Sequence, residues 1–484
     1  MAKRKAPVTP SLLESASRGG DINEGGIAFQ AAVVMGHIPR WIAMEGFTSM
    51  IREAIFDAEA KFFVPGRGYV KEAIEVKDHS LAPAEFWAEI DRFKQVEAGS
   101  PGSYEWFTLA STGLSENLHP LRNSLRRVRD PYGFYRDDPT IFGNSYAEYV
   151  QVVRQLGRRD DDAAFLFGRV LLQDDLSLNR VHGKAVFKQE LFDHLPEQRD
   201  VSDRILEDIY AHLDVFLQSR RNQTITRREV EEHLRERVPA ERRQPPQPVR
   251  LFTAKDDTAV DTRVIHFAWA PFFGGDARDI PYPEPEIWNE QLVGALRATK
   301  AWIVEHRDVR RVRLDGARRL SPAVAIGFVF SAVAGFAVDM VNRGAIWPTD
   351  AHETSDTPAY PLTVGGSFES VRGERLIVTV GIFREIVNDV EADLDRLGLA
   401  ALPTLHIHGA QAIVSPQQLN RIVRDMKGHI SQAQRLTGAR QIDLFLAGPA
   451  PLALFLGHRL NATANIQCYE QVQSGQYVPT CYLS

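Results

Sequence analysis

The fold of the first half of the chain is decided by two neighbouring stretches, IREAIFDAEAKFFV at residues 51–64 and YVKEAIEVKDH at residues 69–79. Apolar and polar residues alternate in both, as in strands that bury one face. A helix is expected before and after this pair. We therefore predict strands over Ile55–Val64 and Tyr69–Val76, and helices over Gly25–His37 and Glu85–Val96. This order of elements predicts a mixed α/β unit.

The alternation also decides which polar side chains share a face. Glu53 and Asp57 are an even number of residues apart, so a strand would point both to one side. Glu75 and Lys77 share a face for the same reason, while the apolar residues between them turn inward. A hairpin-like pairing of the two strands would bring all four polar groups together.

Carboxylates and a lysine in this arrangement suit phosphodiester hydrolysis. Asp57 and Glu75 offer hard oxygen ligands for Mg²⁺, or for Mn²⁺ in its place, and such an ion polarises a phosphate and activates a water. Lys77 can orient that water or offset developing charge, and Glu53 can complete the metal shell. Gln30, in GGIAFQ at residues 25–30, can fix a carboxylate or a phosphate. The catalytic candidates are thus Asp57, Glu75, Lys77, Glu53 and Gln30, with Asp57 and Glu75 as metal ligands.

An ordinary solvated sheet face would give the same pattern, because exposed ion pairs contribute little to stability. An acid two residues before a lysine also occurs at Glu59 and Lys61, and at Asp425 and Lys427. The apolar strand around Glu75, with an acid-bearing strand 18 residues earlier, favours catalysis. The residues alone leave both interpretations open.

These segments resemble the PD-(D/E)xK nucleases, in particular the nuclease domain that is fused to SAVED sensor domains in CBASS antiphage systems. The resemblance rests on GGIAFQ, on ExxxD at Glu53 and Asp57, and on IEVK ending at Lys77. It implies that Asp57 and Glu75 bind the metal and that Lys77 is catalytic. Phe56 stands where the motif's name has proline, a position that the family varies. The resemblance extends over about residues 22–110 and is vaguer to 238.

Length and composition indicate a chain of two or three globular domains. The chain has 484 residues, of which 44% are apolar and 25% charged. Its net charge of -6 means that any binding of nucleic acid rests on a local basic surface. The two cysteines, Cys468 and Cys481, exclude a disulfide framework and a four-cysteine zinc module, and they fit a reducing cytoplasm.

The clearest boundary is the proline-rich segment PAERRQPPQPV at Pro239–Val249. It predicts a nuclease-type domain with a helical extension at 1–238, a linker at 239–250 and a second domain at 251–484. Residues 1–20 are basic but lack the apolar stretch of a secretory signal. Leu320–Val338 has 19 residues without a charge, for which we expect a long buried helix and no membrane span.

A basic segment in the first half, LRNSLRRVRDPYGFYR at residues 121–136, could follow a DNA backbone. A charged helix face followed by a turn is the alternative. The cations concerned are Arg122, Arg126, Arg127, Arg129 and Arg136.

In the second half, short β-rich runs alternate with amphipathic helices, which predicts mostly parallel sheets covered by helices. A local pattern also occurs twice: a strand, a glycine turn, a proline in the first helical turn, and a later glycine. We predict a duplication, with units at about 255–372 and 373–484. The matching positions are Leu314, Gly316, Pro322, Ala325 and Gly327 in the first copy and Leu446, Gly448, Pro451, Leu454 and Gly457 in the second.

This half resembles the SAVED domain, which is similar to two fused CARF-type, Rossmann-like units that bind cyclic oligonucleotides. In such a fold, ligands lie beyond the carboxyl ends of parallel strands, where helix amino termini face phosphates. The resemblance implies stacking of bases on Trp269 and Phe272. The other candidates for the ligand pocket are Arg318, Arg319, Ser321, His408, Gly448 and Pro449. His406 and His408 form a pair without a third ligand at suitable spacing, so a zinc site there is not expected.

The resemblances together imply an antiviral effector: a cyclic di- or trinucleotide, made by a partner nucleotidyltransferase of the CD-NTase type, binds the SAVED half. Binding promotes homo-oligomerisation, and the first half then cuts double-stranded DNA. Two alternatives remain open. One is a nucleotide-binding protein with a nuclease-like but non-catalytic domain, and the other is a restriction-type nuclease that needs no nucleotide.

Overall fold

The computed structural model of the chain describes residues 24–135, 138–176, 180–240, 243, 245–254, 261–273, 283–316, 319–461, 463–473 and 475–484. The chain forms two compact units that meet in sequence near Arg243. The expected site residue Arg318 lies outside the described residues.

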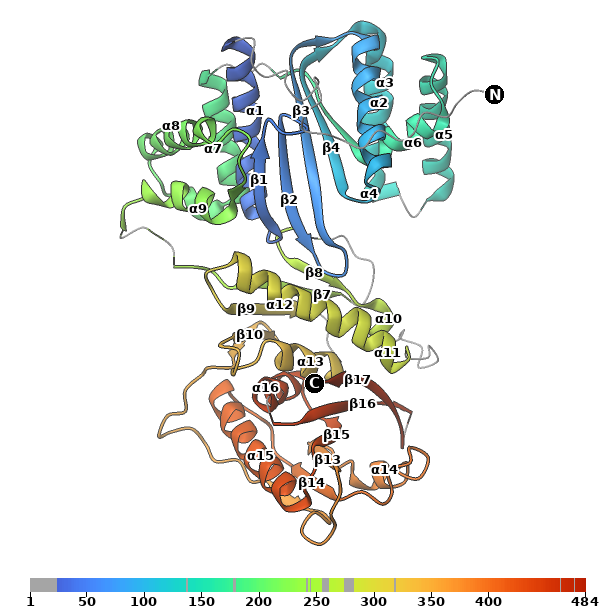
Figure 1. Cartoon of the computed structure of the whole chain (residues 1–484), viewed down its shortest axis with the longest axis vertical. Helices are drawn as coiled ribbons and strands as arrows, with labels where there is room; N and C mark the ends of the chain where they lie inside the picture. The colour runs from blue at the N-terminus through green and yellow to red at the C-terminus, as the bar shows by residue number, and fades with distance from the viewer. Residues whose placement is uncertain are drawn as a thin grey trace. The chain divides into compact units, whose positions relative to one another are not determined.

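The first unit is built on a six-stranded sheet in the order β5, β4, β3, β2, β1, β6 (Figure 1). β1 pairs antiparallel with β2 and β6, whereas β4 is parallel to both β3 and β5. The two edge strands come from later parts of the chain. The strands are β1 (Phe47–Arg52), β2 (Ala58–Val64), β3 (Gly68–Leu81), β4 (Tyr104–Leu114), β5 (Val170–Gln173) and β6 (Ile225–Thr226).

Helices cover this sheet on both sides (Figure 1). On α2, the apolar residues Phe86, Ile90 and Phe93 are fully buried, and the Phe93 ring stacks on Phe107 of β4 at 5.0 Å. This packing fixes α2 against the strands that carry the candidate site. The helices are α1 (Glu24–Ala43), α2 (Pro83–Gly99), α3 (His119–Arg129), α4 (Tyr132–Tyr135), α5 (Pro139–Gln155), α6 (Asp160–Arg169), α7 (Arg180–His194), α8 (Asp203–Ser219) and α9 (Arg227–Glu236).

The strand predicted from Ile55 begins only at Ala58, and this part of the prediction is wrong. Residues 53–57 form a bend between β1 and β2, because Glu53 has a left-handed backbone with φ +56°. A strand cannot continue through that conformation. Asp57 therefore reaches the site from the bend and not from the alternation of a strand.

The second unit contains two sheets, and the same arrangement occurs in each. The order β8, β7, β9, β10, β11 of one sheet corresponds to β14, β13, β15, β16, β17 of the other, to which β12 adds an edge. The first four strands of each set are parallel and the last is antiparallel. The second unit thus contains two similar copies, each with a mostly parallel sheet, and this confirms the predicted fold class.

The described helices and strands of the second unit fall into two consecutive copies along the chain. The first copy has β7 (Val249–Ala254), β8 (Ile265–Ala268), α10 (Ala270–Phe273), α11 (Pro285–Ile287), α12 (Gly294–His306), β9 (Arg311–Gly316), α13 (Leu320–Val329), β10 (Ala337–Asn342) and β11 (Ala345–Pro348). The second has β12 (Thr363–Gly365), β13 (Arg375–Ile382), α14 (Val387–Glu391), β14 (Thr404–Gly409), α15 (Pro416–Thr437), β15 (Gln441–Ala447), α16 (Ala450–Leu460), β16 (Asn465–Gln473) and β17 (Gln476–Leu483).

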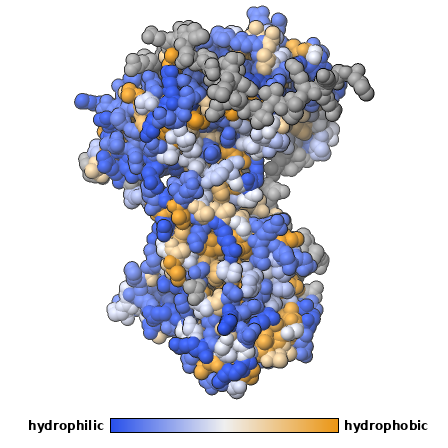
Figure 2. Space-filling model, viewed as in Figure 1, coloured by the Kyte–Doolittle hydropathy of each residue, from blue (hydrophilic) through white to orange (hydrophobic). Residues whose placement is uncertain are grey.

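We expected the apolar run Leu320–Val338 to form one long helix, and this expectation is wrong. α13 ends at Val329, a turn follows, and Ala337 already belongs to β10. Within the described part of the chain, no helix is long and apolar enough to cross a membrane. On the face seen in Figure 2, hydrophilic residues predominate and hydrophobic ones form small separate groups.

Candidate functional site

The Asp57 carboxylate is held at both oxygens. Gln30 of α1 donates its Nε2–H to Oδ1 at 2.5 Å, and the backbone N–H of Val76 donates to Oδ2 at 2.7 Å. Val76 stands between Glu75 and Lys77 on β3. The structure therefore brings Gln30, Asp57, Glu75 and Lys77 together, although the bend and not a strand delivers Asp57.

Two side chains of α2 that the sequence analysis did not select complete this cluster. Lys77 Nζ lies 3.0 Å from Glu75 Oε1 and 2.8 Å from Glu89 Oε1. Arg92 Nη1 lies 3.0 Å from Glu75 Oε2 and 3.3 Å from Glu89 Oε2. Glu75 and Glu89 thus alternate with Lys77 and Arg92 in a closed ring of charges. The sequence did contain a signal for these two residues, because Glu89 and Arg92 are one helical turn apart beside the apolar stripe of α2.

Burial makes ionisation of the two predicted metal ligands costly. Burial, followed by the nearby Asp57 charge, raises the pKa of Glu75 to about 7. Burial also raises the pKa of Asp57, against the hydrogen bond from Val76, which lowers it. Burial lowers the pKa of Lys77, but Glu75 and Glu89 outweigh it and raise that pKa overall. Lys77 is therefore an ammonium, and the two acids have the charge and hard oxygens that a divalent cation such as Mg²⁺ neutralises.

Glu53 does not join this cluster as the sequence analysis expected. Its Oε1 lies 3.3 Å from Nε of Arg221. The left-handed backbone at Glu53 breaks the alternation that would have aligned it with Asp57. Next to it, Arg52 is fully buried, and none of its guanidinium nitrogens has a hydrogen-bond partner among the described residues.

Most of the basic segment of α3 is engaged inside the unit. Arg122 and Arg126 both contact Asp174, at 2.8 and 2.5 Å, and Arg129 donates to the carbonyl of Val170 at 2.8 Å. These contacts favour a structural role over DNA contact for three of the five arginines. Arg127 is exposed, and Arg136 lies outside the described residues.

In the second unit, the structure favours a core role for the two aromatic residues that we expected to stack on bases. Trp269 is 4% exposed and packs against Phe267, with ring centroids 4.8 Å apart. Phe272 is 2% exposed and packs edge-on against Trp288 at 5.0 Å. Neither ring presents an open face for a base.

The amino terminus of α13, expected to face a phosphate, is filled from within the protein. The N–H of Ser321 donates to Glu470 Oε1 at 2.7 Å, and the Ser321 hydroxyl accepts from Thr480 at 2.9 Å. Burial raises the pKa of the Glu470 carboxyl, against the Ser321 bond, which lowers it. Ser321 is buried and Arg319 half-buried. These contacts favour a structural role for Ser321 over contact with a ligand, because Glu470 occupies that end of the helix.

The remaining ligand candidates do share one sheet edge. His408 of β14, Gly381 of β13 and Ala447 of β15 form a row at the carboxyl ends of these parallel strands. Gly448 and Pro449 follow Ala447 directly, and Pro449 is the N-cap of α16, whose amino terminus has no side-chain cap. Since Glu470 caps α13 and no described side chain is seen to cap α16, the second copy offers the better place for a phosphate.

Phe383, which the sequence analysis missed, stands at the same edge. It follows β13, its N–H donates to the carbonyl of Gly409 at 2.9 Å, and its side chain is 61% exposed. Its φ of +68° is unusual for a residue other than glycine. No periodicity in the sequence marks such a residue. An exposed ring held by a strained backbone is a suitable surface for base stacking.

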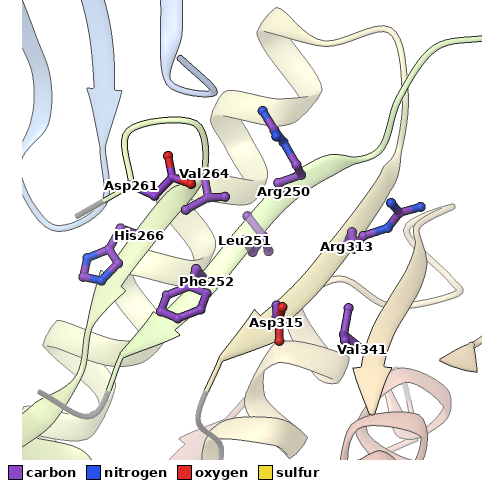
Figure 3. A pocket seen from close by; sticks show the side chains of 9 residues that line it. All are labelled: Arg250, Leu251, Phe252, Asp261, Val264, His266, Arg313, Asp315 and Val341. Carbon is purple, nitrogen blue, oxygen red and sulfur yellow. The ribbon is translucent and has the colours of Figure 1, made fainter. Parts of the chain in front are cut away.

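A cavity of about 340 Å³ lies on the sheet of the first copy (Figure 3). It is lined along the strands by Arg250, Leu251 and Phe252 of β7, His266 of β8, and Arg313 and Asp315 of β9, so it belongs to a face of the sheet and not to the carboxyl ends of its strands. Arg250, Arg313 and Asp315 bring charge to it, and the rings of Phe252 and His266 stack with centroids 5.9 Å apart. Of the expected ligand residues that the structure describes, none lines this cavity.

The second unit is thus built from two Rossmann-like copies, and the first is a mixed α/β unit with a largely buried cluster of acids and a lysine. Residues 295–483 match the family model of SAVED, the SMODS-associated and fused to various effectors sensor domain. The second unit therefore contains a SAVED domain. The predicted resemblance to CBASS effectors is confirmed, because the chain is similar over nearly its full length to proteins called CD-NTase-associated protein 4.

Two such relatives, from Moraxella osloensis and an Acinetobacter species, are each 26% identical over 479 residues, covering 99% of this chain and 100% of the relative. Solved structures agree in fold. The Acinetobacter baumannii Cap4 SAVED/CARF-domain containing receptor with the cyclic trinucleotide 2'3'3'-cAAA matches with a TM-score of 0.82 at 24% identity, over 96% of this chain and 100% of the other. The Moraxella osloensis receptor matches with a TM-score of 0.76 over the same shares.

Proposed function

We propose that this chain is a metal-dependent DNA endonuclease that a cyclic oligonucleotide activates by binding to the SAVED domain. The observation that carries the proposal is the cluster of Asp57, Glu75 and Lys77, in which Glu75 is buried and the other two are partly buried, with Gln30 and Val76 holding the Asp57 carboxylate. Buried acids with raised pKa values beside a lysine are typical of catalytic sites.

Each residue of the cluster has a task that follows from its contacts. Asp57 and Glu75 would hold Mg²⁺ or Mn²⁺, which when bound supplies a Lewis acid for the scissile phosphate and an activated water. Gln30 keeps the Asp57 carboxylate oriented. Lys77, held between Glu75 and Glu89, orients the attacking water and offsets the charge that develops on the phosphate.

For the activating ligand we propose a cyclic trinucleotide. Relatives of the same fold are solved with 2'3'3'-cAAA and 3'3'3'-cAAA, which favours this ring size over a dinucleotide. His408, Gly448, Pro449 and Phe383 are the proposed contacts. Ligand binding shifts an equilibrium only when the two states bind it differently, so we expect the site to be tightened in a ligand-induced homo-oligomer.

The test is cleavage of plasmid DNA by the purified full-length protein with Mg²⁺ and single members of a panel of cyclic di- and trinucleotides. Cutting that depends on one trinucleotide supports the proposal. Lys77→Ala should lower the rate by about 100-fold or more. Lys71→Ala is the matched control: Lys71 lies on the same strand and pairs with Glu59 at 3.4 Å, outside the cluster, so its rate should stay within about threefold of wild type.

Other outcomes would identify the alternatives. Cutting in metal without nucleotide would indicate a restriction-type nuclease. Antiviral protection that survives Lys77→Ala would indicate a nucleotide-binding protein with a non-catalytic domain. Size-exclusion chromatography tests assembly, since full activation without a change in mass would rule out the oligomer.

A further inference from the structure

Two histidines and a glutamate meet between α8 and α9, away from the cluster around Asp57. His212 lies on α8, and His233 and Glu236 lie one turn apart on α9. One potential ligand atom from each residue can be chosen so that all three atoms lie within 4.8 Å of one another. The imidazole centroids are 4.8 Å apart.

The facing atoms of this group are not used by other parts of the protein. Nε2 of His212 and Nδ1 of His233 are buried, and neither has a hydrogen-bond partner among the described residues. They lie 3.4 Å and 3.9 Å from Oε2 of Glu236. Ligands about 2.0–2.1 Å from a tetrahedral zinc ion are about 3.3 Å apart, so small side-chain movements would close the group around one ion.

We propose that His212, His233 and Glu236 form a second metal site, selective for zinc or a similar borderline cation. Two imidazoles and one carboxylate suit Zn²⁺, whereas the all-carboxylate pair Asp57 and Glu75 suits Mg²⁺. Three protein ligands leave the fourth position to water. The two sites therefore differ in the metal that each prefers.

One contact opposes binding and makes the proposal more specific. Arg237 Nη2 lies 3.1 Å from Nδ1 of His212. A guanidinium only donates, so Nδ1 accepts and the ring proton of neutral His212 stays on Nε2. Zinc at Nε2 requires the ring proton to move to Nδ1, and Nδ1–H can no longer accept from the exposed Arg237, which must turn away. Removal of Arg237 should therefore not weaken zinc binding.

The site would join two helices that flank one edge of the nuclease-type sheet. The segment between α8 and α9 includes β6, which pairs with β1, and Arg221, which contacts Glu53. Arg227 at the start of α9 donates to the carbonyls of Ile42 and Met44 at 2.7 and 2.9 Å. A metal at His212 and His233 would stabilise this edge without touching Asp57 or Glu75.

The test is a titration of the full-length protein with Zn²⁺ against a chromophoric zinc chelator, in excess Mg²⁺ so that the carboxylate pair is saturated. We expect one zinc per chain. His212→Ala and His233→Ala should each weaken binding by at least about 10-fold, because losing even a hydrogen-bond partner of a ligand commonly costs that much. Co²⁺ should give the strong visible absorption of a tetrahedral site. Circular dichroism checks that each variant is folded, and His233→Gln is the conservative second variant.

The chain offers a matched control. His194 lies 3.2 Å from Glu190 on α7, and this pair belongs to no group of three potential metal ligands among the described residues, so His194→Ala should bind zinc like the wild type. Arg237→Ala should bind zinc at least as tightly. Equal affinity in the wild type, His212→Ala and His233→Ala, or a weak octahedral Co²⁺ spectrum, would overturn the proposal. DNA cleavage does not enter this readout, so its outcome is independent of the proposed function.

Discussion

Gly327 and Gly457 occupy reciprocal positions in the contact between α13 and α16. A Cβ on Gly327 would stand 2.0 Å from the carbonyl oxygen of Leu454, and one on Gly457 would stand 2.2 Å from that of Val324. Each helix thus requires a residue without a side chain where the other helix crosses it. The pair marks the equivalent points of the two copies of the sensor.

The first prediction follows from this crossing. Gly327→Ala should destabilise the protein by about 1–3 kcal/mol, because the obstructing atoms are backbone and cannot turn aside. Thermal unfolding of the full chain measures it. Gly428→Ala on α15 is the control, since no atom lies within 4 Å of its added Cβ. Equal melting temperatures for the two variants would contradict the prediction.

The second prediction concerns pH. The pKa of Glu75 is about 7 in the folded protein against an ordinary value of 4.5, so the folded state binds its proton more tightly. Stability should therefore fall as pH rises from about 4.5 to about 7, by at most about 3 kcal/mol. Melting temperatures in EDTA from pH 5 to 8 should show this fall in the wild type and not in Glu75→Gln.

On the same strand, β3, the pKa of Glu72 is shifted in the opposite direction to that of Glu75. Arg40 and Trp41 donate to Glu72, and although burial raises its pKa, these partners lower it overall. Glu72→Gln should thus cost stability at pH 8, where Glu75→Gln does not.

Mg²⁺ at pH 8 should raise the melting temperature of the wild type and leave that of Glu75→Gln nearly unchanged. A wild-type melting temperature in EDTA that stays constant from pH 5 to pH 8 would contradict the raised pKa of Glu75.

The third prediction concerns Arg52. Burial lowers the pKa of this guanidinium, against the nearby Glu53 charge, which raises it. Arg52→Met should raise the free energy of unfolding by about 1–4 kcal/mol, as when buried charges are replaced by apolar groups of similar volume. Arg221→Met, which removes the partly exposed ion pair to Glu53, should change it by less than about 1 kcal/mol. Denaturant titration decides, and destabilisation by Arg52→Met would mean that an anion pairs with the guanidinium.

The fourth prediction concerns the ligand edge. If the proposed cyclic trinucleotide is the ligand, Phe383→Ala should weaken its binding by roughly 10- to 100-fold, since stacking on one aromatic residue contributes about 1–3 kcal/mol. Its melting temperature should hardly change, because the ring is exposed. Val333→Ala, which alters another exposed apolar side chain, serves as the control in calorimetric titrations. Unchanged affinity in Phe383→Ala would remove this residue from the site.

Much of the fold follows from local periodicity. The helix predicted over Glu85–Val96 is α2 (Pro83–Gly99), and the strand predicted over Tyr69–Val76 lies within β3 (Gly68–Leu81), because both segments are strongly patterned. The duplication could be predicted because the same kinds of residue recur in the same order: a strand, a glycine turn, a proline in the first helical turn, and a later glycine. Asp57, Glu75 and Lys77 could be selected because their chemistry and spacing are local features.

What the sequence could not predict depends on contacts between distant segments. Glu470 fills the end of α13 from 149 residues beyond Ser321, and no pattern around Ser321 announces it. The left-handed backbone at Glu53 is adopted by a residue type that does not favour it, so alternation gave the wrong strand start. Trp269 was chosen for its chemistry, whereas packing against Phe267 decides its environment.

The two edge strands of the nuclease-type sheet bear on how the protein is made. Residues 30–92 contain every candidate catalytic side chain, yet β5 ends at Gln173 and β6 at Thr226. When a ribosome has made only residues 30–92, the chain already contains the acids and the lysine, but both edge strands of the sheet are still missing. During translation, the sheet that carries these side chains can therefore be completed only after residue 226, long after the side chains themselves have been made.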